Sequence, residues 1–253
     1  MLDSSKGNVL ITGAARRIGR DIACHLAGLG WNVAVHYRKS KSDAIELRSQ
    51  LETYGVKSEI CAADLSNEAE VEHLFEKATK ALGPVTCLIN NASVFEEDTT
   101  TTVTRDLWDR HMEVNLRAPF VLSQNLANQL PDEIFGSIIN IVDQRVWNPT
   151  PYFTSYTLSK MALWDMTQVL AKSLAPRIRV NAIGPGPTLQ SVHQSEADFA
   201  AEVAAVPLKR DVSPADISRG VQFILESPTM TGQMIALDSG QHLGWLPPKG
   251  GLK

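Results

Sequence analysis

Short apolar runs alternate with longer amphipathic segments along the whole chain. The amphipathic segments repeat their apolar residues at helical spacing and predict helices near 17–29, 41–54, 67–82, 104–130, 154–175 and 213–226. The apolar runs are rich in β-branched residues and predict seven strands, at Asn8–Ile11, Asn32–Tyr37, Lys57–Ala62, Thr86–Asn90, Ser137–Val142, Arg177–Ile183 and Gln233–Leu237. Because strands that alternate with helices form parallel sheets, the pattern predicts an α/β fold, doubly wound, with a seven-stranded parallel sheet and helices on both faces.

The pattern contains no internal repeat, low-complexity stretch or linker, so we expect a single domain over residues 1–253. The segment 184–207 is weakly periodic and holds Pro185, Pro187 and Pro207, which predicts a substrate flap near the strand ends. The tail 246–253 has two prolines and two glycines, so we expect it to be flexible unless a partner subunit holds it.

Composition excludes several classes of protein. Hydrophobic residues make up 43% of the chain, which argues against general disorder, and a net charge of −4 without a basic stripe argues against nucleic acid and anionic membranes. The apolar runs are too short to span a membrane, and residues 1–8 are too polar for a secretory signal. Cys24, Cys61 and Cys87 are widely spaced and the six histidines show no ligand spacing, so we expect no disulfide framework, no metal site and a cytoplasmic location.

A glycine-bearing loop follows the first strand and opens the first helix. Gly13 permits a tight turn, Gly19 permits close packing of helix on sheet, and the N–H groups of the helix start can bind a pyrophosphate. The spacing is not G-x-G-x-x-G, so an ordinary βα turn is the alternative interpretation. The cofactor contacts predicted from this loop are Gly13, Arg16, Arg17, Ile18 and Gly19.

The end of the second strand indicates which dinucleotide would bind. NAD enzymes usually place an acidic residue there to bind the ribose 2′-hydroxyl, whereas this chain has no acid before Asp43. The cations of Arg16, Arg38 and Lys39, with the Ser40 hydroxyl, suit a 2′-phosphate and favour NADPH. A solvated surface cluster is the alternative. The predicted contacts here are His36, Tyr37, Arg38, Lys39 and Ser40.

A phenol and an ammonium group lie one helical turn apart, at Tyr156 and Lys160, and Asp143 precedes the tyrosine by thirteen residues. A phenol with a pKa near 10 is a poor acid at neutral pH, and a neighbouring cation favours its anion. The pair alone is also a common surface arrangement, so its weight comes from the motifs around it.

With these motifs the sequence resembles the short-chain dehydrogenase/reductase family, which has the Rossmann fold, over nearly its whole length. The resemblance implies that Tyr156 is the acid/base, that Lys160 lowers its pKa and binds the nicotinamide ribose, and that Asn115 supports a proton relay. The matching pieces are the Thr12–Gly19 loop, Asp64-Leu65, Asn90-Asn91-Ala92, Asn115 between Val114 and Leu116, Tyr156 with Lys160, and Arg179-Val180-Asn181 leading to Pro185-Gly186. It further implies that Asp64 and Leu65 border the adenine, Asn91 and Ala92 the ribose, and Gly186 and Thr188 the nicotinamide end.

Two positions depart from the usual family pattern. Asp143 stands where the family normally has a serine, and Arg17 stands where it normally has the central glycine of the loop. Together with the stretch Asn91-Ala92-Ser93-Val94-Phe95, these residues resemble the pteridine reductase branch. That resemblance implies that Phe95 stacks on a pterin, that Ser93 and Arg17 contact cofactor phosphate and pterin, and that the protein is a homotetramer built through the helices at 104–130 and 154–175.

Reduction of a pterin explains the acidic residue. Hydride goes to a ring carbon and a proton to a ring nitrogen, and an acid beside Tyr156 can hydrogen-bond the ring edge and help to pass the proton. We therefore expect NADPH-dependent reduction of a dihydropterin or of dihydrofolate, with Arg17, Ser93, Phe95, Asp143 and Tyr156 binding the substrate. Asp143 as a loop cap and Phe95 as a core residue are the alternatives for single residues. A carbonyl or 3-oxoacyl reductase and a non-catalytic NADP-binding sensor are the alternatives for the whole protein.

Overall fold

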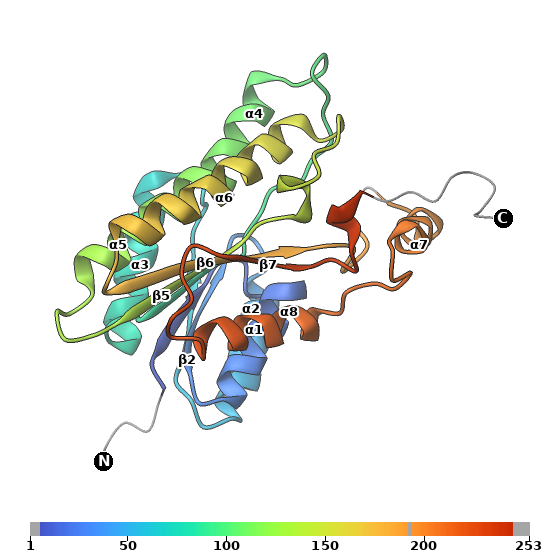
Figure 1. Cartoon of the computed structure of the whole chain (residues 1–253). Helices are drawn as coiled ribbons and strands as arrows, with labels where there is room; N and C mark the ends of the chain where they lie inside the picture. Colours follow the sequence, from blue (N-terminus) through green and yellow to red (C-terminus); the bar gives the residue numbers. More distant parts are fainter. Residues whose placement is uncertain (1–5, 192–193, 245–253) are drawn as a thin grey trace.

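Seven parallel strands form one sheet at the centre of the molecule. The computed structural model describes residues 6–191 and 194–244, and the sheet has the order β3-β2-β1-β4-β5-β6-β7 (Figure 1). All six strand pairings are parallel. The strands are β1 Asn8–Ile11, β2 Asn32–Tyr37, β3 Ser58–Ala62, β4 Cys87–Asn90, β5 Gly136–Ile141, β6 Ile178–Pro185 and β7 Met234–Leu237.

Helices cover both faces of the sheet. One layer holds α1, α2 and α8, and the other holds α3, α5 and α6, with α4 beside α6 (Figure 1). The helices are α1 Arg17–Gly28, α2 Lys41–Glu52, α3 Glu68–Leu82, α4 Arg105–Met112, α5 Ala118–Gln129, α6 Thr154–Ser173, α7 Glu196–Ala205 and α8 Pro214–Leu225, with short helical turns η1 Glu113–Arg117, η2 Gln144–Val146 and η3 Gln241–Leu243.

The strands are apolar because both of their faces are buried. Side chains alternate across a strand, so Val9 and Ile11 of β1 pack into the core under α1 and α8 while Leu10 packs into the core under α3 and α5. All six residues of β2 and all six of β5 are buried. Because the strands are parallel, their carboxyl ends meet at one edge of the sheet, and a ligand crevice is expected there.

The structure confirms the predicted fold class and corrects two segments. The predicted helix 104–130 is divided by η1, a π-helical turn at Glu113–Arg117. The segment 184–207, predicted as a flap without regular structure, contains the end of β6 and the helix α7. The predicted tail 246–253 lies outside the described residues. Within the described ranges, no helix is both long and apolar enough to cross a membrane.

Candidate active site

The loop between β1 and α1 needs glycine at two places. Gly13 has a φ of +63°, and its N–H donates to Nδ1 of His36 at 2.9 Å. A Cβ atom on Gly19 would lie 2.4 Å from the Gly13 carbonyl oxygen and 2.6 Å from Nδ2 of Asn91, so only glycine lets the helix pack this closely. Asn91 donates to the carbonyl oxygens of Thr12 and Gly13 and so fixes the loop to the end of β4.

A cavity lies beside this loop, and we call it the loop cavity. Most residues predicted to contact the cofactor line it: Gly13, Arg16, Arg17, Ile18, Gly19, His36, Arg38, Asp64, Leu65, Asn91, Ala92 and Ser93. Six predicted residues do not line it. Tyr37 is buried in the core, and Lys39 and Ser40 lie at the turn into α2. Lys160, Gly186 and Thr188 line a different cavity, described below. The structure therefore brings together the larger part of the predicted set.

The polar side chains of the loop cavity form hydrogen bonds and an ion pair with neighbouring residues. Burial lowers the pKa of His36 to about 4, and its ring nitrogens bond to the Gly13 N–H and the Ala63 carbonyl, so the ring is a neutral structural link. Asp64 accepts from the backbone N–H and the hydroxyl of Ser66, which lowers the pKa of its carboxyl. Arg16 is exposed and pairs with Asp43 at 2.6 Å.

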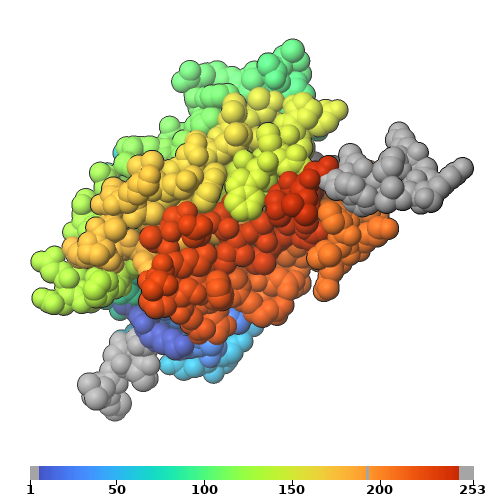
Figure 2. All heavy atoms as spheres, in the orientation of Figure 1, coloured from blue at the N-terminus to red at the C-terminus, as the bar shows by residue number. Residues whose placement is uncertain are grey.

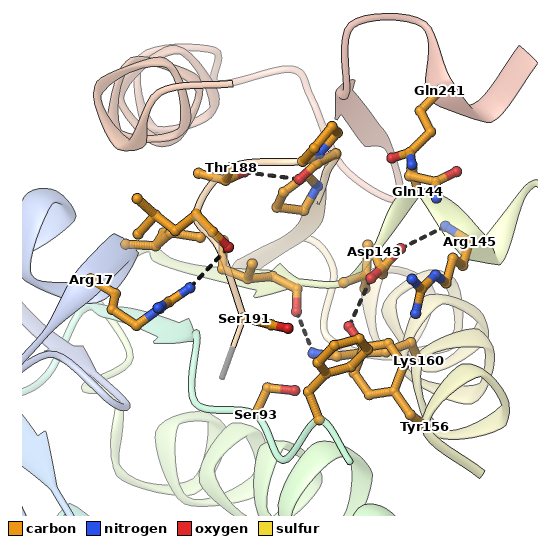
Figure 3. A pocket seen from close by; sticks show the side chains of 18 of the residues that line it. Arg17, Ser93, Asp143, Gln144, Arg145, Tyr156, Lys160, Thr188, Ser191 and Gln241 are labelled. Carbon is orange, nitrogen blue, oxygen red and sulfur yellow. Dashed lines mark hydrogen bonds between the residues drawn. The ribbon is translucent and has the colours of Figure 1, made fainter. Parts of the chain in front are cut away.

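Arg17 connects the loop to the segment that follows β6. Its φ of +54° is in the left-handed region, where a residue other than glycine is strained. The guanidinium donates to the carbonyl oxygens of Leu189 and Gln190 at 3.0–3.1 Å. The same side chain lines the loop cavity and a second cavity at the carboxyl ends of β4, β5 and β6, which we call the central cavity (Figure 3).

The central cavity contains the predicted catalytic pair. The Tyr156 hydroxyl donates to Oδ2 of Asp143 at 2.8 Å, and the Lys160 ammonium donates to the Ile141 carbonyl oxygen at 2.8 Å (Figure 3). Asp143 lies two residues after the end of β5, while Tyr156 and Lys160 lie in the first two turns of α6 and are almost fully buried. Oδ1 of Asp143 also accepts from the Arg145 backbone N–H, so the same carboxylate caps η2 and bonds the phenol.

Burial and charge set the proton affinities of this group. Burial raises the pKa of Tyr156 well above its usual value, the charge of Asp143 raises it further, and the guanidinium of Arg145 lowers it. Burial lowers the pKa of Lys160 to about 8, against the charge of Asp143. The sequence pointed to Lys160 as the cation acting on the phenol, and that role stays a prediction. Arg145 is a second cation, which lowers the tyrosine pKa and which the sequence did not indicate.

Asn115 lies in the π-helical turn η1 and is completely buried. Its Nδ2 donates to the Val94 carbonyl and the Ser159 hydroxyl at 3.0 Å, and its Oδ1 accepts from the Val94 N–H and the Ser93 hydroxyl. Asn115 thus joins the segment after β4 to α6, three residues from Tyr156. Its place in a proton relay stays a prediction.

Phe95 belongs to an aromatic cluster at the wall of the central cavity. Its ring stacks on Phe153 with centroids 4.3 Å apart and meets Tyr156 edge-on at 4.7 Å. Phe153 therefore covers one face of the Phe95 ring, and the Arg145 guanidinium lies 5.3 Å from its centroid. The predicted residues that line this cavity are Arg17, Ile18, Asn91, Ser93, Phe95, Asp143, Tyr156, Lys160, Gly186 and Thr188.

The far end of the central cavity is formed by parts of the chain that are distant in sequence. Gln144, Glu202 and Gln241 line it, and Nε2 of Gln241 donates to Glu202 of α7 at 3.1 Å. The rings of Trp147, just after η2, and His242, in η3, pack edge to face. The two turns therefore form a continuous surface (Figure 2). The helix α7, which the sequence analysis did not predict, therefore supplies part of the cavity wall.

The comparisons with known proteins identify the family. The family model for short chain dehydrogenases matches residues 7–200. The chain belongs to the short-chain dehydrogenase family. In this short-chain dehydrogenase, Asp143 stands where the family usually has a serine, and it accepts a hydrogen bond from the Tyr156 hydroxyl.

The proteins similar to this short-chain dehydrogenase are named as several different reductases. The crystal structure of FolM alternative dihydrofolate reductase 1 from Brucella suis in complex with NADP is 44% identical, with a TM-score of 0.93, and the match covers 98% of this chain and 99% of that one. A short-chain type dehydrogenase/reductase of Picea abies is 32% identical over 246 residues, covering 92% of this chain and 91% of that protein. The 3-oxoacyl-[acyl-carrier-protein] reductase FabG of Staphylococcus epidermidis is 30% identical over 241 residues, covering 93% and 99%.

Proposed function

We propose that this chain is an NADPH-dependent reductase of dihydropterins, with dihydrofolate as a second candidate substrate. The observation that carries the proposal is the 2.8 Å hydrogen bond from the Tyr156 hydroxyl to Asp143, inside a cavity that Arg17, Ser93 and Phe95 also line. The likeness to a FolM dihydrofolate reductase at 44% identity supports the same substrate class.

The residues of the loop cavity fit a phosphorylated dinucleotide. A Cβ atom on Gly13 or Gly19 would fill space between the loop and Asn91-Ala92, and the cations of Arg16 and Arg38 line the cavity. NADPH bound there supplies a hydride. Arg38 and Arg16 would hold the 2′-phosphate, with Lys39 nearby, and Lys160 would hold the ribose next to the central cavity.

The chain's own groups deliver the proton. Tyr156 would donate its hydroxyl proton to a ring nitrogen of the pterin, and the Asp143 carboxylate would hold the phenol and the ring edge in place. Phe95, which lines the central cavity, would contact the flat ring, and Asn115 holds the segment that carries Ser93 and Phe95 against α6. We infer a cytoplasmic homotetramer from the family resemblance, and light scattering would test the assembly.

Arg38 should select NADPH over NADH. We expect Arg38→Ala to weaken NADPH binding about tenfold or more, because a charge-assisted hydrogen bond to the 2′-phosphate contributes about 1.5–3 kcal/mol. NADH binding should stay within about twofold of the parent. Fluorescence titration of both nucleotides measures this, with the exposed Lys41→Ala at the start of α2 as control. Equal weakening of both nucleotides would contradict 2′-phosphate recognition.

Asp143 should be needed for pterin reduction but not for cofactor binding. We expect Asp143→Ser to lower kcat for a dihydropterin about 10²-fold, because the carboxylate that bonds Tyr156 is lost, while the NADPH Kd changes little. The exposed Asp165→Ser on α6 serves as the matched control. Unchanged turnover in Asp143→Ser would count against the pterin assignment.

The second candidate function is reduction of a carbonyl or 3-oxoacyl substrate, which the FabG likeness at 30% identity favours. Following NADPH absorbance with dihydropterins, dihydrofolate, simple ketones and acyl ketones decides between the two. Equal or faster reduction of acyl ketones would overturn the pterin proposal. NADPH binding without turnover of any member of the panel would instead favour a non-catalytic sensor.

A further inference from the structure

Arg145 places a partly buried cation beside the aromatic cluster of the central cavity. Its guanidinium carbon lies 5.0 Å from the ring centroid of Phe153, 5.3 Å from that of Phe95 and 6.0 Å from that of Tyr156. Among the described residues, no carboxylate forms a salt bridge with it, and its buried Nη1 has no hydrogen-bond partner. A buried charged N–H without a partner is costly, so its retention calls for a functional explanation.

Arg145 is structurally tied to the residue that distinguishes this site. Its backbone N–H donates to Oδ1 of Asp143, and Oδ2 of the same carboxylate accepts from the Tyr156 hydroxyl (Figure 3). One short turn, η2 with its capping residue, therefore directs an anion and a cation toward the same phenol.

We propose that Arg145 is a positioning residue that offsets the charge of Asp143 at Tyr156, so that the phenol can give up its proton. This inference rests on the proposed role of Tyr156 as proton donor. When the proton passes from the Tyr156 oxygen to the substrate nitrogen, a phenolate is left beside the Asp143 carboxylate. The guanidinium stabilises that phenolate against the like charge, and a neutral serine at 143 would create no such need.

Two further titratable side chains face the ring of Tyr156. Lys160, on the same helix, has its ammonium 5.8 Å from the ring centroid and donates to the Ile141 carbonyl. His111 of α4 faces the ring at 6.1 Å, and burial lowers the pKa of its imidazole. Arg145 acts on the phenol in the direction opposite to the Asp143 carboxylate, and its guanidinium lies about as far from the ring as the Lys160 ammonium.

The pH dependence of kcat tests the proposal. Reduction needs the protonated phenol, so the rate falls as pH rises through the Tyr156 pKa. We expect Arg145→Met to move this alkaline limb up by about one pH unit and to lower kcat about tenfold, because an opposite charge at 4–6 Å shifts a pKa by about 1–3 units. Asp143→Asn should move the limb down, and the double variant should return it close to the parent. Arg145→Lys should keep the limb nearly in place.

Controls separate this inference from the proposed function. Arg117→Met removes another arginine that lies over a phenylalanine ring, with its guanidinium carbon 5.6 Å from the Phe120 centroid, and it should leave the profile unchanged. If Arg145 only supported the aromatic packing, Arg145→Met would lower kcat without moving the limb, which would overturn the inference. Full activity of Tyr156→Phe would instead overturn the role of Tyr156 on which the inference depends.

Discussion

Replacing Tyr156 by phenylalanine is expected to lower kcat for the best substrate about 10³-fold. General acid catalysis contributes about 10²–10⁴ in rate, and the hydroxyl is the donor that reaches into the central cavity beside Asp143. The phenyl ring keeps the edge-on contact with Phe95, so the fold and the NADPH Kd should be almost unchanged. Single-turnover kinetics with NADPH, together with a nucleotide titration, separate the chemical step from binding.

The matched control is Tyr152→Phe. Tyr152 lies four residues earlier, is 59% exposed and does not line the central cavity, so its variant should keep parent activity. A Tyr156→Phe enzyme that retained more than about a tenth of the parent kcat would show that another group supplies the proton.

Replacing Asp98 by alanine is expected to destabilise the protein by about 3 kcal/mol. Asp98 is 2% exposed, and its carboxylate accepts from the backbone N–H and the hydroxyl of Ser155 at the start of α6. His111 completes the network, because its Nδ1 bonds the Ser155 hydroxyl at 2.6 Å. Alanine would leave buried donors without an acceptor at a helix N-terminus, and each such loss costs about 1–3 kcal/mol.

Urea unfolding of Asp98→Ala against Asp106→Ala measures this effect. Asp106 is an exposed acid in the first turn of α4, so its loss should cost about 0.5 kcal/mol. Because Tyr156 directly follows Ser155, Asp98→Ala should also lower kcat. Equal stabilities of the two variants would show that the buried network contributes little.

The helices and strands of the sheet layers could be predicted because the spacing of apolar residues along the chain indicates them. Strands such as β2 and β5 are buried on both faces and so appear as continuous apolar runs. The helix α7 was not predicted because it is short and its alanine-rich sequence does not separate clearly into an apolar and a polar face. Its one local signal was the capping box of Ser195 and Asp198.

The candidate site could be predicted only in part. Motif spacing placed Asp143, Tyr156 and Lys160 together, since the strand end and the following helix turn are close in the chain. The Asp98–Ser155–His111 network was missed because its members are 44 and 57 positions apart and meet only in the folded chain. Arg145 was missed because nothing in its local sequence shows which rings will surround it.

The π-helical turn η1 limits how the chain can vary in length. A π turn closes its hydrogen bonds one residue further along the chain than an α-helical turn does, and such turns are frequent at functional sites. Deleting one residue between Thr104 and Gln129 would restore a regular helix but rotate Asn115 away from Val94 and Ser159. The number of residues between these two helix ends therefore affects the active site, because the contacts of Asn115 depend on the extra residue of the π-helical turn.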